Sequence, residues 1–218
     1  MPLALFDLDH TLVNADTPSL WLEYLIGKAL LPARETREKI AAFARDYSAG
    51  TLDYPSYLRF ELEPLRDHAP DDLLAWRETY QTEMLRPHIS QSARDLLQKH
   101  RDAGDTLAII TATSRFIAEA SARELDVEHL IATDVESIDG RFTGDYTGQE
   151  CFQAGKIKKL QEWLAGSDHS LDGSWFYSDS INDLPLLEAI RNPVAVNADA
   201  RLADIAAARG WPTLDLRT

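Results

Sequence analysis

The sequence has little of what would define several other classes of protein. It contains one cysteine among 218 residues, Cys151, so a disulfide framework and a cysteine-rich zinc site are both excluded. We interpret this cysteine as a packing residue. No stretch approaches the about 20 consecutive apolar residues that a membrane helix needs. The segment Met1–Asp7 has no basic residue, so we expect a β-strand there, no signal peptide and a cytoplasmic protein.

Basic residues are also scarce relative to acidic ones. The chain has 22 Lys and Arg against 36 Asp and Glu, which gives a net charge of −14. General nucleic-acid binding requires a basic surface, so this function is excluded. An acidic protein still attracts a phosphorylated small molecule where a local site holds Mg²⁺. We therefore expect a small phosphorylated metabolite as the partner, no nucleic acid, no membrane, and a monomer or homodimer.

The chain is long enough for one full domain and a smaller inserted one. Residues Leu3–Phe6 form a short apolar run that ends at acids, which indicates a buried strand. From about Thr17 to Leu85, apolar residues recur at helical spacing and predict a small bundle of helices. We expect the prolines of this region to lie at helix boundaries. They are Pro32, Pro55, Pro64, Pro70 and Pro87.

Strands alternate with helices in the rest of the chain. The predicted helices are Ser90–Ala103, Phe116–Leu125, Lys156–Leu164, Leu184–Ile190 and Ala200–Arg209. The predicted strands are Leu107–Ile110, Leu130–Val135, Trp175–Tyr177 and Val194–Val196, with a hairpin over Ile138–Phe142 that turns at Asp139-Gly140. This alternation predicts an α/β fold with a doubly wound parallel sheet and an inserted α-helical bundle. We place the core domain at residues 1–13 and 87–218, and the helical domain at residues 14–86.

Two acids follow the first strand. In extended backbone, residues two positions apart face the same side, so Asp7 and Asp9 face one site. Their carboxylates repel each other unless a cation or a shared proton offsets the charge. We expect Mg²⁺, a cation that takes oxygen ligands. Asp179 and Asp183 follow another predicted strand and supply further oxygens, because ligands bind at the carboxyl ends of parallel strands.

A phosphate dianion also needs hydrogen-bond donors and positive charge, and two residues offer them. Thr111 ends a predicted strand and has a hydroxyl and an exposed backbone N–H near a helix start. Lys156 follows Gly155 near the start of a helix and supplies a point charge. Carboxylate, Mg²⁺, hydroxyl and ammonium together form a site for phosphoryl transfer, where the protein positions groups and stabilises charge.

In this arrangement the chain resembles the haloacid dehalogenase-like (HAD) hydrolase superfamily, in particular its phosphoserine-phosphatase-like subfamily IB. The four family motifs occur in order: D-x-D-x-T at Asp7–Thr11, then Thr111, then Lys156, then the acidic motif Asp179–Asp183. The helical insert between the first two motifs matches the cap domain of this branch. The resemblance covers essentially the whole chain and implies a Rossmann-like HAD core with a helical cap.

The resemblance also implies a role for each matched residue. Asp7 attacks phosphorus and forms an acyl phosphate. Asp9 protonates the leaving alcohol and then activates the water that hydrolyses this intermediate. Mg²⁺ is held by a carboxylate oxygen of Asp7, the backbone carbonyl of Asp9 and the side chain of Asp179. Thr111 and Lys156 bind the phosphoryl oxygens.

Three further residues take supporting roles by the same resemblance. Asn182 and Asp183 support the metal and Lys156. Thr11 either stabilises the turn or contacts phosphate. The implied enzyme is a Mg²⁺-dependent phosphatase that hydrolyses a small-molecule phosphomonoester through an aspartyl-phosphate.

The sequence departs from the commonest fourth motif at two positions. Ser178 stands where glycine is frequent before Asp179, and Ser180 stands where glycine is frequent after it. Both residues are small and the acids remain, so we keep the prediction of a metal site.

The region that would select the substrate is less informative. Asn14 and Asp16 are close enough to the first motif to face a substrate, and Arg45 and Arg59 are candidates to pair with a substrate anion. Each of these four residues can also be interpreted as a structural or solvent-facing residue. Other residues have structural interpretations too: Thr113 and Ser114 as helix caps, and Trp21 and Trp76 as bundle core. Phosphate contact is an alternative interpretation of Thr113.

The sequence therefore leaves a few alternatives for the substrate and for the type of reaction. The segment Asn14–Trp21 also resembles HAD relatives that act on histidinol phosphate, and an acidic cap suits a cationic amino-alcohol phosphate. Phosphoserine is the other candidate. A phosphotransferase or mutase on the same fold, and a phospho-accepting signalling module, are alternative functions. The helical insert and the second acid of the first motif argue against the signalling module.

Overall fold

The computed structural model describes residues 2–218. Within that range, one sheet contains seven strands in the order β4–β3–β2–β1–β5–β6–β7. The strands are β1 (Leu3–Phe6), β2 (Thr106–Ser114), β3 (His129–Ile138), β4 (Arg141–Thr147), β5 (Trp175–Ser178), β6 (Asn192–Val196) and β7 (Thr213–Leu214). Neighbouring strands are parallel except β3 and β4, which are antiparallel. The predicted parallel α/β sheet is confirmed, with one antiparallel strand at its edge.

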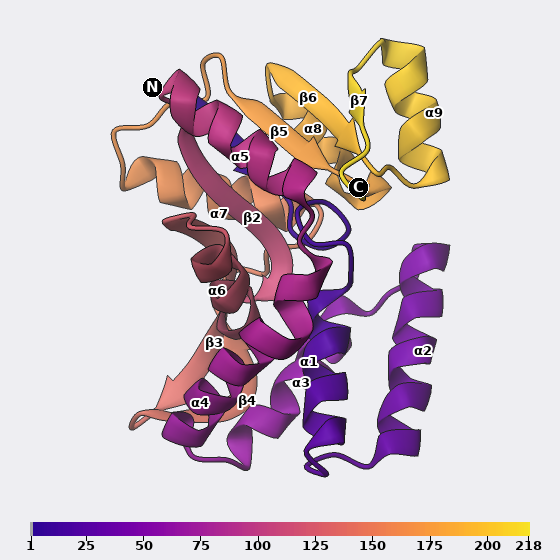
Figure 1. Cartoon of the computed structure of the whole chain (residues 1–218), viewed down its shortest axis with the longest axis vertical. Helices are drawn as coiled ribbons and strands as arrows, with labels where there is room; N and C mark the ends of the chain where they lie inside the picture. The colour runs from indigo at the N-terminus through magenta and orange to yellow at the C-terminus, as the bar shows by residue number, and fades with distance from the viewer. Residues whose placement is uncertain (1) are drawn as a thin grey trace.

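Helices cover both faces of this sheet (Figure 1). They are α5 (Gln91–Ala103), α6 (Arg115–Glu124), α7 (Ala154–Ala165), α8 (Leu184–Ala189) and α9 (Ala200–Arg209). Ala4 and Phe6 of β1 pack in one apolar cluster with Leu97 of α5. Leu3 and Leu5 pack in a second cluster that includes residues of α7, α8 and α9. Because successive strand residues point to opposite faces, an apolar residue at every position of β1 fits a strand buried on both sides.

A helical insert lies between β1 and β2. It consists of α1 (Thr17–Gly27), α2 (Ala33–Ala49), α3 (Tyr54–Arg66) and α4 (Pro70–Tyr80), followed by a π-helical turn, η1 (Gln81–Leu85), and a 3₁₀ turn, η2 (Arg86–His88). Trp21 and Tyr80 are fully buried in it and meet edge to face, with ring centroids 5.5 Å apart. Their cluster extends to the face of the sheet that α5 covers. The insert and the sheet therefore share one core, and the prediction that Trp21 is a core residue is confirmed.

The prolines of the insert mostly lie where they were expected. Pro32 is the N-cap residue of α2, and α3 and α4 each have a proline in their first positions. Pro64 is the exception, because it lies inside α3. A proline there has no N–H to donate to Phe60, which interrupts the hydrogen bonding of the helix close to its end at Arg66.

The strand boundaries show how much short strands depend on tertiary pairing. β2 does not end at Thr111 as predicted but continues to Ser114, with a shift of register against β3 after Ile110. β7 has two residues and was not predicted. The predicted hairpin is confirmed between β3 and β4, and Asp139 and Gly140 both adopt positive φ at its turn. Within residues 2–218, the helices are all too short or too polar to cross a membrane.

Candidate active site

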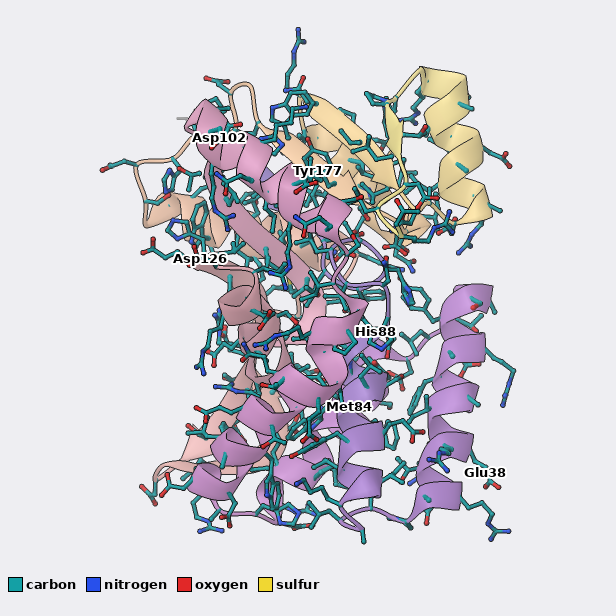
Figure 2. All side chains as sticks on the ribbon, viewed as in Figure 1. Glu38, Met84, His88, Asp102, Asp126 and Tyr177 are labelled. Atoms are coloured by element: carbon teal, nitrogen blue, oxygen red, sulfur yellow. The ribbon has the colours of Figure 1, made fainter. Side chains whose placement is uncertain are left out.

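Three adjacent strands bring the predicted residues to one edge of the sheet. β1 lies between β2 and β5. Asp7 follows β1, Thr111 lies in β2, and Asp179 follows β5. The backbone N–H of Asp7 donates to the carbonyl of Tyr177 at 2.9 Å, which extends the pairing of β1 with β5 beyond Phe6 (Tyr177 is labelled in Figure 2). All three side chains line one cavity, as expected where the carboxyl ends of parallel strands meet.

Lys156 connects two buried carboxylates. Its Nζ lies 2.7 Å from Asp7 Oδ1 and 2.7 Å from Asp183 Oδ2. Burial alone would lower the pKa of Lys156, but the charges of Asp183 and Asp7 outweigh it and raise that pKa. Burial raises the pKa of Asp183 to about 6 although Lys156 opposes the shift. Ser178 Oγ also donates to Asp183 Oδ2 at 2.7 Å, so this serine helps to fix the partner of Lys156.

The position before Lys156 requires glycine for a steric reason. A β-carbon at Gly155 would lie 2.1 Å from the carbonyl oxygen of Glu150, a distance that no side chain tolerates without a backbone shift. The residue before this helix, Gln153, adopts a φ of 48°. The tight turn therefore starts α7 close against the preceding loop and places Lys156 in its first turn, facing Asp7.

Asp9 has hydrogen-bond partners of its own. Its Oδ1 accepts from the backbone N–H of Thr17 at 2.6 Å, and its Oδ2 accepts from Thr113 Oγ1 at 2.5 Å. Burial, and then the charge of Asp16, raise the pKa of Asp9. A carboxyl with a raised pKa keeps its proton closer to neutral pH, as a general acid must. The interpretation of Thr113 as a helix cap was wrong, because β2 continues far enough to bring this residue to Asp9.

Ser114, the other expected cap, connects the sheet to the insert instead. It occupies the N-cap position of α6 without a capping hydrogen bond, and its Oγ donates to Glu61 Oε1 at 2.5 Å. Glu61 lies on α3 and is 1% exposed, and its Oε2 has no hydrogen-bond partner within residues 2–218. Burial raises the pKa of Glu61 to about 8. The carboxyl is therefore protonated at neutral pH, which lowers the cost of burying it.

Asp179 has few partners for its negative charge. Thr11 Oγ1 donates to its Oδ1 at 3.3 Å. Burial, and then the charges of Asp7 and Asp183, raise the pKa of Asp179 well above its ordinary value. Burial likewise raises the pKa of Asp7, against the opposing effect of the lysine beside it. Neighbouring carboxylates with raised pKa values are stabilised by a divalent cation, so these donors fit Mg²⁺.

The described side chains limit which oxygens such a site could use. Within residues 2–218, no three His, Cys, Asp or Glu side chains are grouped so that they could hold a metal. The side chain of Asp9 is engaged by Thr17 and Thr113. A site made of the Asp7 and Asp179 carboxylates and the backbone carbonyl of Asp9 needs no third carboxylate side chain.

The predicted residues line a single cavity of about 360 Å³. Its walls include Asp7, Asp9, Thr111, Lys156, Asp179, Asn182 and Asp183. Thr11 is the one predicted residue that does not line the cavity. It is fully buried and donates a hydrogen bond to Asp179, which does line it. The structure therefore brings all eight predicted residues together around one cavity.

The residues that the sequence interpretation missed are mostly aromatic. Phe43, Tyr47, Tyr54, Tyr57 and Phe152 line the same cavity. Phe152 stacks on Tyr54 with ring centroids 4.4 Å apart. The apolar spacing of the insert indicated that such residues face inward, but it did not show that the inward side of α2 and α3 borders a cavity.

Of the four candidates for substrate contact, one lines the cavity and three do not. Asp16 lines the cavity, and its Oδ1 accepts from the N–H of Ser19 at 2.8 Å. Asn14, Arg45 and Arg59 are not among the residues that line it. Arg59 instead pairs with an acid on β4 at 3.2 Å. No arginine within residues 2–218 lines the cavity, so Lys156 supplies its permanent positive charge.

A comparison with protein families identifies the class of protein that this fold and site define. The model of the haloacid dehalogenase-like hydrolases matches residues 4–188. The chain belongs to this family, and its phosphatase relatives make it a phosphoric monoester hydrolase.

Several individual proteins are similar to this chain over nearly its whole length. The chain is 41% identical to a histidinol-phosphatase of Neisseria meningitidis serogroup C, over 99% of each chain. It is 31% identical to a phosphoserine phosphatase of Mycobacterium tuberculosis, over 98% of this chain and 70% of that one. A crystal structure of a protein of unknown function from Bordetella pertussis Tohama I matches with 42% identity and a TM-score of 0.91, covering 99% of this chain and 98% of that one.

More distant structures agree on the fold alone. A substrate-bound phosphoserine phosphatase matches with a TM-score of 0.71 at 18% identity, over 99% of this chain and 93% of that one. This agreement confirms the predicted α/β core with its helical insert.

Proposed function

We propose that this enzyme is a Mg²⁺-dependent phosphatase that forms an acyl phosphate on Asp7. The observation that carries the proposal is the placement of Asp7, at the end of β1 and beside Lys156 at 2.7 Å. That contact uses Oδ1 and holds the carboxylate at the end of β1. A carboxylate that is held in place by a lysine and lines a cavity is suited to act as a nucleophile.

The proposed reaction has two steps. In the first, an Asp7 oxygen bonds to phosphorus, the bond from phosphorus to the alcohol oxygen breaks, and Asp9 gives its proton to that oxygen. In the second, water attacks phosphorus while Asp9 takes the water's proton, and the bond from phosphorus to Asp7 breaks. The raised pKa of Asp9 supports the first role, because burial and Asp16 favour its protonated form.

Mg²⁺ would be held by Asp7, Asp179 and the backbone carbonyl of Asp9. When bound, it neutralises charge on the phosphoryl oxygens and on the carboxylates around them. Lys156 and Thr111 would bind the phosphoryl oxygens, with Asn182 and Asp183 supporting Lys156 and the metal site. The network around Asp183, with Ser178 and Lys156 each at 2.7 Å, supports this arrangement.

We further propose that the alcohol of the substrate is cationic and carries no carboxylate. A carboxylate in the leaving group would need a positive partner, and no arginine within residues 2–218 lines the cavity. Asp16 lines the cavity together with aromatic side chains, and this combination suits a cation with an aromatic ring. The relative named histidinol-phosphatase is the more similar of the two named phosphatases. Histidinol phosphate is therefore our proposed substrate, ahead of phosphoserine.

We also propose that residues 14–86 form a cap domain on a core of residues 1–13 and 87–218. The strands that flank the insert, β1 and β2, are neighbours in the sheet. The two connections lie side by side, because the N–H of Asn14 donates to the carbonyl of His88 at 2.8 Å. Such paired crossings are what a compact insertion requires.

A substrate panel tests the proposal. Phosphate release is measured from histidinol phosphate, phosphoserine and sugar phosphates, with Mg²⁺ and with a chelator, for the wild-type protein and Asp7→Asn. We expect histidinol phosphate to have the highest kcat/KM, with release dependent on both Mg²⁺ and Asp7. Preference for phosphoserine would contradict the proposed substrate, and full activity of Asp7→Asn would contradict the mechanism.

A further inference from the structure

Helix α2 forms one wall of the cavity. Figure 1 shows it standing apart from the sheet, at the outside of the insert, and Figure 2 shows Glu38 on its outer side. The cavity is lined on this side by Ile40, Phe43, Ala44, Tyr47 and Ser48. Their spacing of three and four residues places them on one face of the helix. The position of α2 therefore sets the width of the cavity on this side.

The hydroxyl of Tyr47 ties this wall to the sheet domain. The hydroxyl of Tyr47 lies 2.8 Å from Ser180 Oγ. Within residues 2–218, no other side chain of α2 forms a hydrogen bond with a residue outside the insert. The other inter-helical pair of α2 joins Arg37 to Glu23 of α1, at 2.6 Å, and stays within the insert.

Ser180 is suited to this contact by its identity and its position. It is one of the two serines that replace a frequent glycine of the fourth motif, and glycine has no hydroxyl to offer. The side chain is buried, and its Oγ also accepts from the N–H of Asn182 at 3.2 Å. Ser180 directly follows Asp179, so its hydroxyl joins α2 to the loop that carries a proposed metal ligand.

The ring of Tyr47 belongs to an aromatic surface of the cavity. Its centroid lies 6.4 Å from that of Phe152, which in turn stacks on Tyr54. The Tyr54 hydroxyl donates to the carbonyl of Ala112, next to Thr111. Both tyrosines therefore use their hydroxyl groups to hold the insert on the sheet domain and leave their rings facing the cavity.

We propose that Tyr47 is a specificity-determining residue, held by Ser180, for the alcohol part of the substrate. This inference rests on the proposed phosphatase function and adds the surface that recognises the leaving group. A flat cationic ring packs against aromatic side chains by stacking and by cation–π attraction. A short amine such as that of ethanolamine phosphate has no ring to place there.

Substitutions on both sides of the hydrogen bond test the proposal. The variants are Tyr47→Phe, Ser180→Ala and the double variant. Tyr146→Phe is the matched control, because it also loses a hydroxyl hydrogen bond, to Glu150, but does not line the cavity. The readouts are kcat and KM for histidinol phosphate and for ethanolamine phosphate.

Each single substitution is expected to lower kcat/KM for histidinol phosphate about fivefold through KM, the size expected for one hydrogen bond. Ethanolamine phosphate should change less than about twofold, and the double variant should lose no more than either single variant. Equal losses for the two substrates, or losses that multiply in the double variant, would overturn the proposal.

Hydrogen exchange of the amides in residues 33–49 separates this proposal from the proposed function. Both single variants should exchange about fivefold faster there than the wild-type protein and Tyr146→Phe. Unchanged exchange would overturn the role of the hydrogen bond and leave the phosphatase proposal untouched. If the wild-type protein released phosphate from no monoester, the proposed function would fail and the specificity role would fail with it.

Discussion

The ammonium group of Lys156 lies 2.7 Å from the carboxylate of Asp7, and both groups are buried. The pair joins two distant parts of the chain, since Asp7 follows β1 and Lys156 lies in the first turn of α7. A second carboxylate, Asp183, lies at the same distance from the ammonium. The lysine therefore contacts both the proposed nucleophile and the loop that follows β5.

Replacement of Lys156 by methionine tests this relationship. The variant leaves two buried carboxylates without their shared cation, which is strongly destabilising, and removes a charge that would bind the phosphoryl group. We expect kcat to fall by about 100-fold or more and the free energy of unfolding at pH 7 to fall by a few kcal/mol.

The matched control is Lys158→Met, because Lys158 is exposed on the same helix. Lys158→Met should leave both kcat and the free energy of unfolding close to their wild-type values. Near-normal activity of Lys156→Met would show that the third family motif had been assigned to the wrong lysine.

Thr113→Val should alter the pH profile of the enzyme. The Thr113 hydroxyl donates to Asp9 Oδ2 and lowers the pKa of that carboxyl. Removing the donor raises the pKa of Asp9 further. Since the proposed first step uses protonated Asp9, the decline of kcat/KM with rising pH should move to higher pH in the variant.

The measurement is kcat/KM for one substrate across the pH range, for the wild-type protein and for two threonine variants. Thr79→Val is the control, because Thr79 is half-buried on α4, does not line the cavity, and its hydroxyl donates to a carbonyl of its own helix. A shift to lower pH in Thr113→Val, or an equal shift in both variants, would contradict the role of Asp9 as general acid.

Glu61→Gln should change how stability depends on pH. The folded protein holds the pKa of Glu61 at about 8, against an ordinary value of 4.5. Between these two values the unfolded chain loses this proton while the folded chain keeps it, so Glu61 lowers stability as pH rises. Glutamine stays neutral, so the variant should be more stable than the wild-type protein at pH 8 by a few kcal/mol and similar to it near pH 4.5.

Urea unfolding at pH 5, 6.5 and 8 measures this difference. Glu63→Gln is the control, because Glu63 is exposed on the same helix. A constant difference between Glu61→Gln and the wild-type protein at every pH would contradict the raised pKa.

Much of the site could be predicted because strand ends carry strong local signals. Asp7 and Asp9 follow an apolar run with the two-residue spacing of extended chain, and parallel pairing brings Thr111 and Asp179 to the same edge. The continuation of β2 beyond Ile110 left no such signal, because the strand continues with a shift of register against β3. Thr113 was therefore interpreted as a cap, although it contacts Asp9.

The aromatic side of the cavity could not be predicted for a different reason. Residues 40, 43, 44 and 47 repeat at helical spacing, which indicates a face directed inward but does not identify what lies opposite. In the structure the space opposite α2 is partly a cavity, and Tyr47 reaches across to Ser180. The contact joins residues 133 positions apart in the chain, so no local pattern could reveal it.

The most direct test of the account is mass spectrometry of the enzyme stopped with acid during turnover of histidinol phosphate. Asp9→Asn lacks both the acid of the first step and the base of the second, so turnover should be slow and the phosphoenzyme that forms should accumulate. The account predicts one added phosphate, located on Asp7 after digestion, and none in the Asp7→Asn, Asp9→Asn double variant. Phosphate found on another residue, or turnover that survives the loss of Asp7, would contradict the central claim.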